Sequence, residues 1–386
     1  MPSFELRWPQ RPRFIPTLTS LLLAAVCASS LAATPTVQKT SATKHKHKPA
    51  KAKHRLAAPS PLPGPSYAQR ADVMLAAEDM AQRRNLDPAW VRQTLAQAHY
   101  IPAIAKAVTP PAVGVAKNWQ AYRSRFVEPI RIQAGVAFWH THRDELVRAQ
   151  AQTGVPAEII VGILGVETLY GQQSGNYRVI DALTTLAFDF PTSHPRAAQR
   201  SAYFKDELEQ FLSLCSRSSR DPLGIKGSYA GAMGWPQFMP SSWVKYALDF
   251  DADGVVDLMN SPADAIGSVA NYFKAYGWQT GLATHFPVAL DVSRLDMDAL
   301  LAPDILPTFS VASFQAKGAV LTGEALQHTG KLALIELQMG NAPPMYVAGT
   351  DNFYVITRYN WSSYYAMAVI ELGQAVKQAM SAASGH

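Results

Sequence analysis

Glu167 stands at the end of an uninterrupted run of apolar residues and glycine that extends from Ile159 to Val166. Pro156 is placed where a helix can begin, because a proline at the first helical position loses no hydrogen bond. A helix without a polar face is normally buried on all sides. A carboxylate at the end of such a helix loses part of its hydration, which favours the protonated form and raises its pKa. The pattern therefore makes Glu167 a candidate general acid. The alternative is a helix end whose glutamate turns out to water.

A second stretch, from Lys226 to Ser242, places glycines and prolines around Ser228 and Gln237. This composition is typical of an ordered loop whose backbone approaches a ligand closely. The alternative is an ordinary turn before a helix that starts near Ser241. An aromatic cluster between Tyr359 and Tyr365 suits sugar rings, which have apolar faces and hydroxyl edges, although a single tyrosine more often packs in a core.

A third stretch, residues 249–260, has the spacing of a calcium-binding loop. Carboxylates occupy positions 1, 3, 5 and 9, glycine occupies position 6, and position 7 would offer a backbone carbonyl. Position 12, normally glutamate, is Asn260, and Asp264 lies close enough in sequence to close the site. We expect a structural calcium site rather than a solvated acidic turn, with these ligands: Asp249, Asp251, Asp253, Val255 and Asp264.

The charge of the chain is unevenly distributed. The 386 residues carry a formal net charge of +6, but residues 1–70 hold 11 of the 35 Lys+Arg and one of the 29 Asp+Glu. The remainder has a formal net charge of −4. The body of the protein therefore lacks the basic surface expected of a nucleic-acid-binding protein.

The first 33 residues have the pattern of a secretory signal peptide, with three arginines before an apolar stretch and Ser-Leu-Ala-Ala at its end. We expect export to the periplasm; a lipoprotein anchored through Cys27 is the weaker alternative. Residues 34–66 are rich in Ala, Pro, Lys and His and are expected to form a disordered basic linker. Two cysteines exclude a disulfide framework, and Cys215 is expected to pack as a small apolar residue.

Helical spacing dominates the chain from about residue 67 to 285. Helices are predicted over 71–81, 88–98, 133–152, 181–188, 201–216 and 362–380, with Asp181 as a helix N-cap. Between 286 and 358 short alternating runs predict strands at 331–337 and 352–357, separated by a turn over 340–344. The sequence thus predicts a mainly α protein (α+β) with a small late β element, in a folded region that covers residues 67–386.

Several of these motifs resemble the lytic murein transglycosylase B family. The resemblance extends from about residue 70 to 380 and is carried by four segments: Gly165-Val166-Glu167-Thr168, Lys226-Gly227-Ser228 through Gln237 to Ser242, Asp264 to Lys274, and Ile356-Thr357-Arg358-Tyr359-Asn360. Pro236 departs from the family's usual small residue. The acidic loop is similar to the family's calcium site but is one residue longer before Asp264.

The resemblance implies a lysozyme-like helical core with flanking helical segments and a small β domain. It implies cleavage of the β-1,4 bond between MurNAc and GlcNAc in peptidoglycan, with 1,6-anhydromuramoyl ends as products and no cofactor for the chemistry. Glu167 would be the only catalytic acid and base. The glycan would be bound by eight further residues: Ser228, Gln237, Tyr122, Tyr203, Tyr272, Tyr359, Asn360 and Tyr365.

This chemistry needs only one carboxylate. Ordinary glycosidases place two carboxylates about the scissile bond, but Glu158 lies on the other side of the predicted helix from Glu167. A hydrolytic muramidase and a non-catalytic peptidoglycan-binding protein are the alternative functions. We expect a monomer that binds glycan strands, with wall-synthesis proteins as candidate partners.

Overall fold

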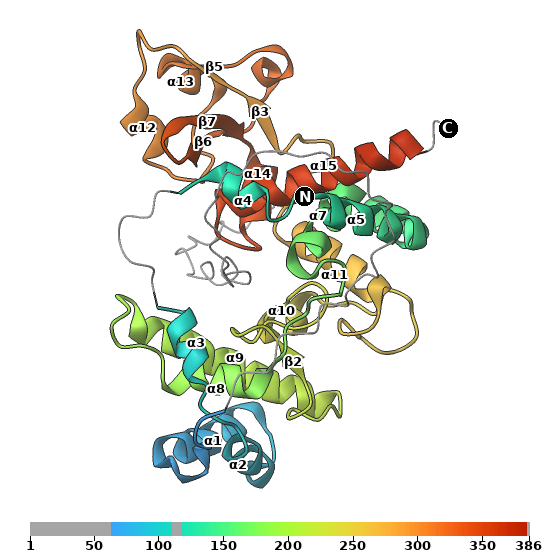
Figure 1. Ribbon diagram of the computed structural model, residues 1–386, viewed down its shortest axis with the longest axis vertical. Coiled ribbons are helices and arrows are strands. Elements are labelled where there is room, and N and C mark those ends of the chain that lie inside the picture. Colours follow the sequence, from blue (N-terminus) through green and yellow to red (C-terminus); the bar gives the residue numbers. More distant parts are fainter. Residues whose placement is uncertain (1–62, 110–116, 384–386) are drawn as a thin grey trace, which may run out of the picture. The chain divides into compact units, whose positions relative to one another are not determined.

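The computed structural model describes residues 63–109 and 117–383, which divide into two compact units. The larger, here called the helical unit, comprises 63–109, 123–275 and 368–383. The smaller, here called the β unit, comprises 117–122 and 276–367. The helix α15 (Ser363–Ala383) begins in the β unit and continues into the helical unit. Figure 1 labels most of the helices and strands, which are numbered in chain order.

The helical unit consists of short and medium helices with one two-stranded ladder. Helix α8 packs along α9 and α1 packs on α2 (Figure 1). Helix α6 packs on α11. The bounds are η1 (Tyr67–Gln69), α1 (Ala71–Arg84), α2 (Pro88–Ala96), α3 (Pro102–Ala107), α5 (Pro129–Thr141), α6 (Arg143–Thr153), α7 (Ala157–Thr168), β1 (Tyr177–Arg178), α8 (Val179–Phe188), α9 (Ala197–Arg217), β2 (Lys226–Gly227), α10 (Pro240–Tyr246) and α11 (Pro262–Ala275).

Helix α7 lies inside this unit, as its apolar sequence predicts. All of its residues except Glu158 are buried. A Cβ atom at Gly162 would lie 2.2 Å from the Val369 carbonyl oxygen, so glycine allows the α15 backbone to approach α7 closely. The single polar residue in its first turn, Glu158, pairs with Lys377 of α15 at 2.7 Å. The burial of α7 therefore depends on both its apolar side chains and its glycines.

The β unit is organised around a three-stranded antiparallel sheet of order β3-β7-β6. Phe286, Leu334 and Ala348 of this sheet pack against Leu300 and Phe314 of the surrounding helices. The bounds are α4 (Trp119–Arg123), β3 (His285–Pro287), β4 (Ala289–Leu290), α12 (Met297–Leu301), α13 (Val311–Ala316), β5 (Ala319–Val320), η2 (Gly323–Gln327), β6 (Ala333–Met339), β7 (Ala342–Gly349) and α14 (Asp351–Thr357).

Two predictions in the β unit were wrong. Residues 352–357 form helix α14 and not a strand, because the Thr350 hydroxyl caps the Asn352 N–H and the short apolar run is buried. A buried run of this length does not reveal its periodicity. The predicted turn over 340–344 is shorter, since β7 already begins at Ala342. Strand β3 pairs only with Val347 to Gly349, so prolines are tolerated at the start of β7, where no β3 partner requires their N–H.

In the helical unit the bounds of several helices differ from the prediction. Asp181 is not an N-cap, because α8 begins two residues earlier; its carboxylate instead accepts a hydrogen bond from the His99 N–H at 2.9 Å. The predicted helix over 133–152 is two helices, α5 and α6, separated at His142. Pro156 is the N-cap of α7 and precedes its first residue.

The predicted signal peptide and most of the predicted linker lie outside the described residues. Residues 63–66, which the sequence assigned to the linker, include Gly64 and Pro65, which exchange backbone hydrogen bonds with Tyr100 at 2.8 and 3.0 Å. Across 63–109 and 117–383, none of the helices combines the length and apolar character that crossing a bilayer would require. The predicted fold class, mainly α with a small late β element, is confirmed.

Candidate active site

Glu167 lies in the last turn of α7 and is 8% exposed. The helix ends directly after it, at Thr168, and the next two residues both adopt left-handed backbone, with φ of 51° at Leu169 and 54° at Tyr170. This conformation is uncommon outside glycine and persists where surrounding contacts enforce it. The Tyr170 N–H closes the helix by donating to the Leu164 carbonyl at 3.1 Å. The chain therefore turns sharply away just beyond the carboxylate.

The Thr168 hydroxyl connects the end of α7 to the glycine-rich loop. It donates to the Trp235 carbonyl at 2.9 Å and accepts from the Gly171 N–H at 3.0 Å. The Trp235 ring lies against Gly171, where a Cβ atom would come within 2.4 Å of it. Trp235 is held in turn by two hydrogen bonds, to the carbonyls of Leu258 and Met259. Thr168, the residue that follows Glu167, is thus held against the loop that carries Gln237.

Ser228 and Gln237 organise that loop from within. The Ser228 Oγ accepts from the N–H groups of Ala230 and Ala232, at 3.3 and 3.0 Å. Gln237 has a φ of 51°, and its side-chain amide donates to the carbonyls of Gly234 at 2.9 Å and Ser174 at 3.2 Å. Ser174 belongs to the segment that follows α7. The loops on which Glu167, Ser228 and Gln237 depend are therefore joined in one hydrogen-bond network.

Gly175 provides a second junction between the same segments. A Cβ atom at Gly175 would lie 2.1 Å from the Gly227 carbonyl oxygen and 2.7 Å from the Ser228 nitrogen. Gly227 itself pairs with Tyr177 across the β1–β2 ladder. Only a residue without a side chain lets the backbone after α7 lie directly on the backbone at Ser228.

Tyr203 and Tyr272, two predicted glycan-binding residues of the helical unit, lie on different helices and differ in their contacts. Tyr203 is on α9 and half-buried, and the guanidinium of Arg200 lies over its ring at 5.4 Å. Tyr272 on α11 is 6% exposed and packs at 5.7 Å from the Phe238 ring, at the end of the glycine-rich loop. Tyr272 therefore borders the loop directly.

The other four predicted residues belong to the β unit. Tyr122 is half-buried and stacks on Trp119 with ring centroids 6.2 Å apart. Tyr359 stacks on Tyr365 at 6.4 Å, and Asn360 is 7% exposed. Tyr365 is only 1% exposed and contributes mainly to packing.

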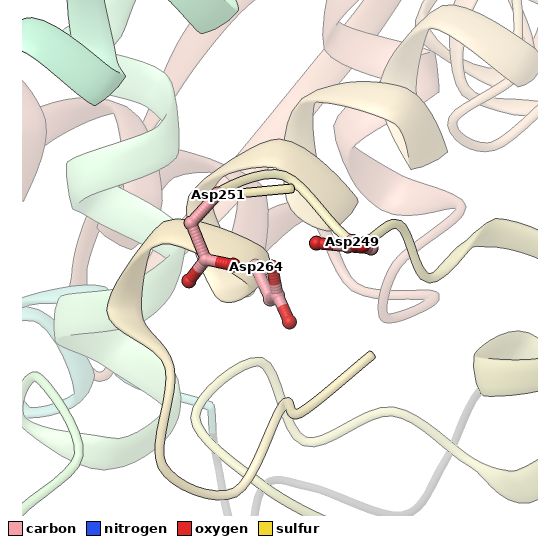
Figure 2. A group of neighbouring side chains, drawn as sticks. All are labelled: Asp249, Asp251 and Asp264. Carbon is pink, nitrogen blue, oxygen red and sulfur yellow. The ribbon is translucent and has the colours of Figure 1, made fainter. Parts of the chain in front are cut away.

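The acidic loop brings together three of its five predicted ligands. Oxygen atoms of Asp249, Asp251 and Asp264 lie within 4.8 Å of one another (Figure 2). Asp264, in the first turn of α11, is fully buried, and burial raises the pKa of its carboxyl group. Its two oxygens accept from the N–H groups of Phe250 and Asp257, both at 2.7 Å. Asp264 therefore closes the loop, as its position in the sequence suggested.

The remaining two predicted ligands are not part of this group. Asp253 accepts from the Val255 N–H at 2.8 Å, and Val255 is exposed. Asp257, at position 9, pairs with Arg220 at 3.2 Å. Three clustered carboxylates form the oxygen-only donor set that Ca²⁺ prefers, so the residues fit that ion.

Sequence reasoning did not single out two residues with prominent roles. Thr168 was noticed only as part of a motif, and its hydroxyl offers no sequence signal beyond its place after Glu167. Glu207 on α9 is 2% exposed and accepts from the Ser241 N–H and hydroxyl at 2.9 and 2.6 Å, at the start of α10. A lone glutamate in a helical pattern is typical of a solvated face, so the spacing alone did not indicate this burial.

Comparison with known proteins defines the class. Residues 69–374 match the family model described as Transglycosylase SLT domain. The chain therefore belongs to this family, and the protein is an enzyme of the lytic transglycosylase class.

The chain is 39% identical over 330 residues to the membrane-bound lytic murein transglycosylase B of Escherichia coli, covering 81% of this chain and 84% of that protein. The E. coli lytic transglycosylase Slt35 in complex with bulgecin A matches with a TM-score of 0.73 and 39% identity, over 82% of this chain and 96% of that one. The calcium complex of Slt35 matches with a TM-score of 0.70 at the same identity and coverage. These likenesses confirm the predicted family and its lysozyme-like helical core.

Proposed function

We propose that this enzyme cleaves the β-1,4 bond between MurNAc and GlcNAc in peptidoglycan and leaves 1,6-anhydromuramoyl ends, with Glu167 as its only catalytic acid and base. One observation carries the proposal. Glu167 is a largely buried carboxylate at the end of a buried helix, and that helix end is tied through Thr168 to the loop that holds Ser228 and Gln237. The activity named for the relatives supports the choice of substrate.

The reaction proceeds in two proton transfers through Glu167. In the first, its carboxyl group donates a proton to the glycosidic oxygen while the bond to the anomeric carbon breaks. The acetamido group of MurNAc stabilises the positive charge that develops there. In the second, the Glu167 carboxylate takes the proton of the 6-hydroxyl of the same sugar, whose oxygen then bonds to the anomeric carbon. The carboxyl group ends protonated again, and no water is consumed.

The positions of other carboxylates in the helical unit support a mechanism with one acid. Glu158 pairs with Lys377, and Glu207 accepts two hydrogen bonds from Ser241. Asp181 accepts from the His99 N–H and pairs with Arg178 at 3.3 Å. Each of these groups has a structural partner, whereas ordinary glycosidases dedicate a second carboxylate to the reaction.

The glycan strand is bound by tyrosine rings together with short polar side chains. The apolar faces of sugars pack on aromatic rings, and hydroxyl edges exchange hydrogen bonds with amide and hydroxyl groups. In the helical unit these contacts come from Ser228, Gln237, Tyr203 and Tyr272. In the β unit they come from Tyr122, Tyr359 and Asn360, and the buried Tyr365 ring supports Tyr359 by stacking on it.

Calcium has a structural role in this proposal. Asp249, Asp251 and Asp264 hold the ion, and the calcium complex of the related Slt35 supports this choice of ion. Asp253 and the Val255 carbonyl, the other predicted ligands, complete the site when the ion is bound. The ion takes no part in bond cleavage. It holds the loop before α11, the helix on which Tyr272 lies.

The enzyme acts outside the cytoplasm, in the periplasm, as a monomer. The predicted signal peptide and the murein substrate in the name of the relative support this location. Wall-synthesis proteins are its candidate partners.

Glu167→Gln tests the assignment of the acid and base. Glutamine keeps the shape of the side chain but neither donates nor takes up the proton, so turnover of purified peptidoglycan should fall by at least ~10²–10⁴-fold. Glu158→Gln, on the same helix, is the matched control and should retain turnover. Retained turnover in Glu167→Gln would overturn the assignment. Products with reducing ends would instead indicate a hydrolytic muramidase, and glycan binding without any product would indicate a binding protein.

A further inference from the structure

The β unit contains a cavity whose lining residues have no role in the catalysis, glycan binding or calcium binding proposed for this enzyme. Its volume is about 250 Å³. Four segments of the chain form its walls: Lys117 before α4, the end of α12 with the turn after it, strand β6, and the start of α15. All four lie within the β unit.

Hydrogen bonds fix these walls to one another. The Lys117 carbonyl accepts from the Gly340 N–H at 3.1 Å, and Asn118 forms an isolated bridge with Met339. The Tyr364 hydroxyl accepts from the Gln338 N–H at 2.8 Å and lies 3.3 Å from the Gln338 carbonyl, to which it donates. The backbone around the cavity is therefore preformed, which lowers the entropic cost of binding a ligand.

Two of the four walls carry a carboxylate, and hydrogen bonds orient one of these carboxylates. The Glu336 carboxylate is half-buried and accepts from the Tyr346 hydroxyl at 3.1 Å and from the Gln338 side-chain amide at 3.2 Å. Asp304 adds a second carboxylate from the turn after α12. These two bonds hold the Glu336 carboxylate in place and leave further acceptor positions on its oxygens.

Lys117 places a positive charge on the same cavity. Within the described part of the chain, neither Lys117, Asp304 nor Glu336 forms an ion pair, with one another or with any other residue. The opposite charges thus share one cavity without neutralising each other. A ligand that carries both an ammonium and a carboxylate group could satisfy both.

The remaining lining is suited to the carbon chain of such a ligand. Ile305, Leu334 and Ile335 are buried residues of the wall. Tyr364 is 9% exposed, and its ring is held at 5.9 Å from Trp119 and 5.8 Å from Tyr122. A cavity lined by apolar groups and by charges of both signs is better suited to an amino acid than to a bare ion.

From this arrangement we propose that the cavity binds a zwitterionic amino-acid group, with Lys117 holding its carboxylate and Glu336 and Asp304 its ammonium. The identification of the ligand as part of the substrate rests on the proposed function, because peptidoglycan carries short peptides on its glycan strands. The cavity would hold the amino-acid end of such a peptide. It is a second point of attachment to the substrate, distinct from the residues that bind sugar.

Binding of small probes tests this proposal without any catalytic step. Isothermal titration calorimetry of the whole chain would compare three probes of similar length: diaminopimelate, which has ammonium and carboxylate groups, pimelate, which has only carboxylates, and cadaverine, which has only ammonium groups. Diaminopimelate should bind at least about tenfold more tightly than either, because only it can form charge-assisted hydrogen bonds both to Lys117, through a carboxylate, and to Glu336 and Asp304, through an ammonium group. Glu167→Gln should bind it equally well, so a failure of the proposed mechanism leaves this result unaffected.

Substitutions then locate the site. Lys117→Gln and Glu336→Gln should each weaken diaminopimelate binding about tenfold. Lys331→Gln and Glu324→Gln are the matched controls, since both residues are exposed in the same unit and neither lines the cavity. No binding of diaminopimelate, equal binding of all three probes, or equal effects in the cavity and control variants would each overturn the proposal.

Discussion

Replacing Thr168 with valine removes the hydroxyl that joins the end of α7 to the glycine-rich loop, while the size and branching of the side chain are nearly unchanged. Two hydrogen bonds are lost, the one donated to the Trp235 carbonyl at 2.9 Å and the one accepted from the Gly171 N–H at 3.0 Å. Thr168 is 1% exposed and its two partners are partly buried, so each partner would lose its bond where water has only limited access. A buried partner left unsatisfied costs about 1–3 kcal/mol, and partly buried partners such as these fall toward the lower end of that range, about 1–2 kcal/mol each.

The two losses together predict a decrease of about 2–4 kcal/mol in the free energy of unfolding. With an unfolding entropy of ~2.1 cal/mol/K per residue over roughly 300 residues, the melting temperature should fall by about 3–6 °C. Turnover should fall more than stability alone explains, since a displacement of the helix end also displaces Glu167. A shift of ~1 Å in a reacting group can cost on the order of 10²-fold in rate.

Thr168→Ser is the matched control, because it keeps the hydroxyl and removes only a methyl group, worth about 0.8 kcal/mol. The assays are thermal unfolding and the rate of product release from purified peptidoglycan at a temperature where all variants are folded. The serine variant should approach the turnover of the unmutated enzyme, and the valine variant should not. Equal turnover in the two variants would refute the positioning role of the hydroxyl.

Three further predictions concern stability. Calcium at a hundredfold excess over its Kd should raise the free energy of unfolding by roughly 2.7 kcal/mol. Asp251→Asn should reduce this gain in a thermal-shift titration, and the absence of any gain in the unmutated protein would contradict the proposed calcium site. Burial raises the pKa of Glu207, so its contribution to stability is present below the unfolded-state pKa of about 4.5 and is lost as the pH rises through its folded-state pKa. In denaturant titrations at several pH values, Glu207→Gln should lose less free energy of unfolding over this range than the unmutated protein. The same pH dependence in both proteins would contradict the prediction. The Tyr170 hydroxyl is buried and has no hydrogen-bond partner among the described residues, so Tyr170→Phe should stabilise the protein by roughly 1 kcal/mol or more, and a lower melting temperature refutes that.

The sequence predicted the core elements of the helical unit because their patterns are long and consistent. The apolar run before Glu167 indicated a fully buried helix, and α7 is buried as expected. The β unit was harder to predict, since its elements are short. The run from Asn352 to Thr357 has the composition of a strand, but a cap from Thr350 and burial on all sides make it a helix.

The motifs of the site were visible in the sequence, whereas the contacts that connect them were not. Glycine at position 175 is explained by its φ of 90° and by its approach to the Gly227 carbonyl, more than fifty residues away in the chain. The same holds for Glu207, whose burial depends on α10 lying against α9. Contacts of this kind depend on tertiary packing, which spacing within one element does not encode.

The acidic loop shows how far the ligands of a single motif can be predicted from its spacing. Its spacing predicted five ligands, and three of them have clustered oxygen atoms. The first positions follow the expected pattern, and Asp264 supplies the closing carboxylate from the next helix. The position of Asp253 was not predictable, because its carboxylate is engaged by the Val255 N–H within the loop.

The proposed mechanism requires that the 6-hydroxyl of the sugar, and not water, attacks the anomeric carbon after Glu167 has protonated the leaving oxygen. Digestion of purified peptidoglycan in water labelled with heavy oxygen, followed by mass spectrometry of the released muropeptides, tests this requirement most directly. We expect anhydro-ended products that contain no heavy oxygen at the anomeric carbon and are one water lighter than muramidase products. Reducing-end products that carry heavy oxygen at that carbon would contradict the mechanism.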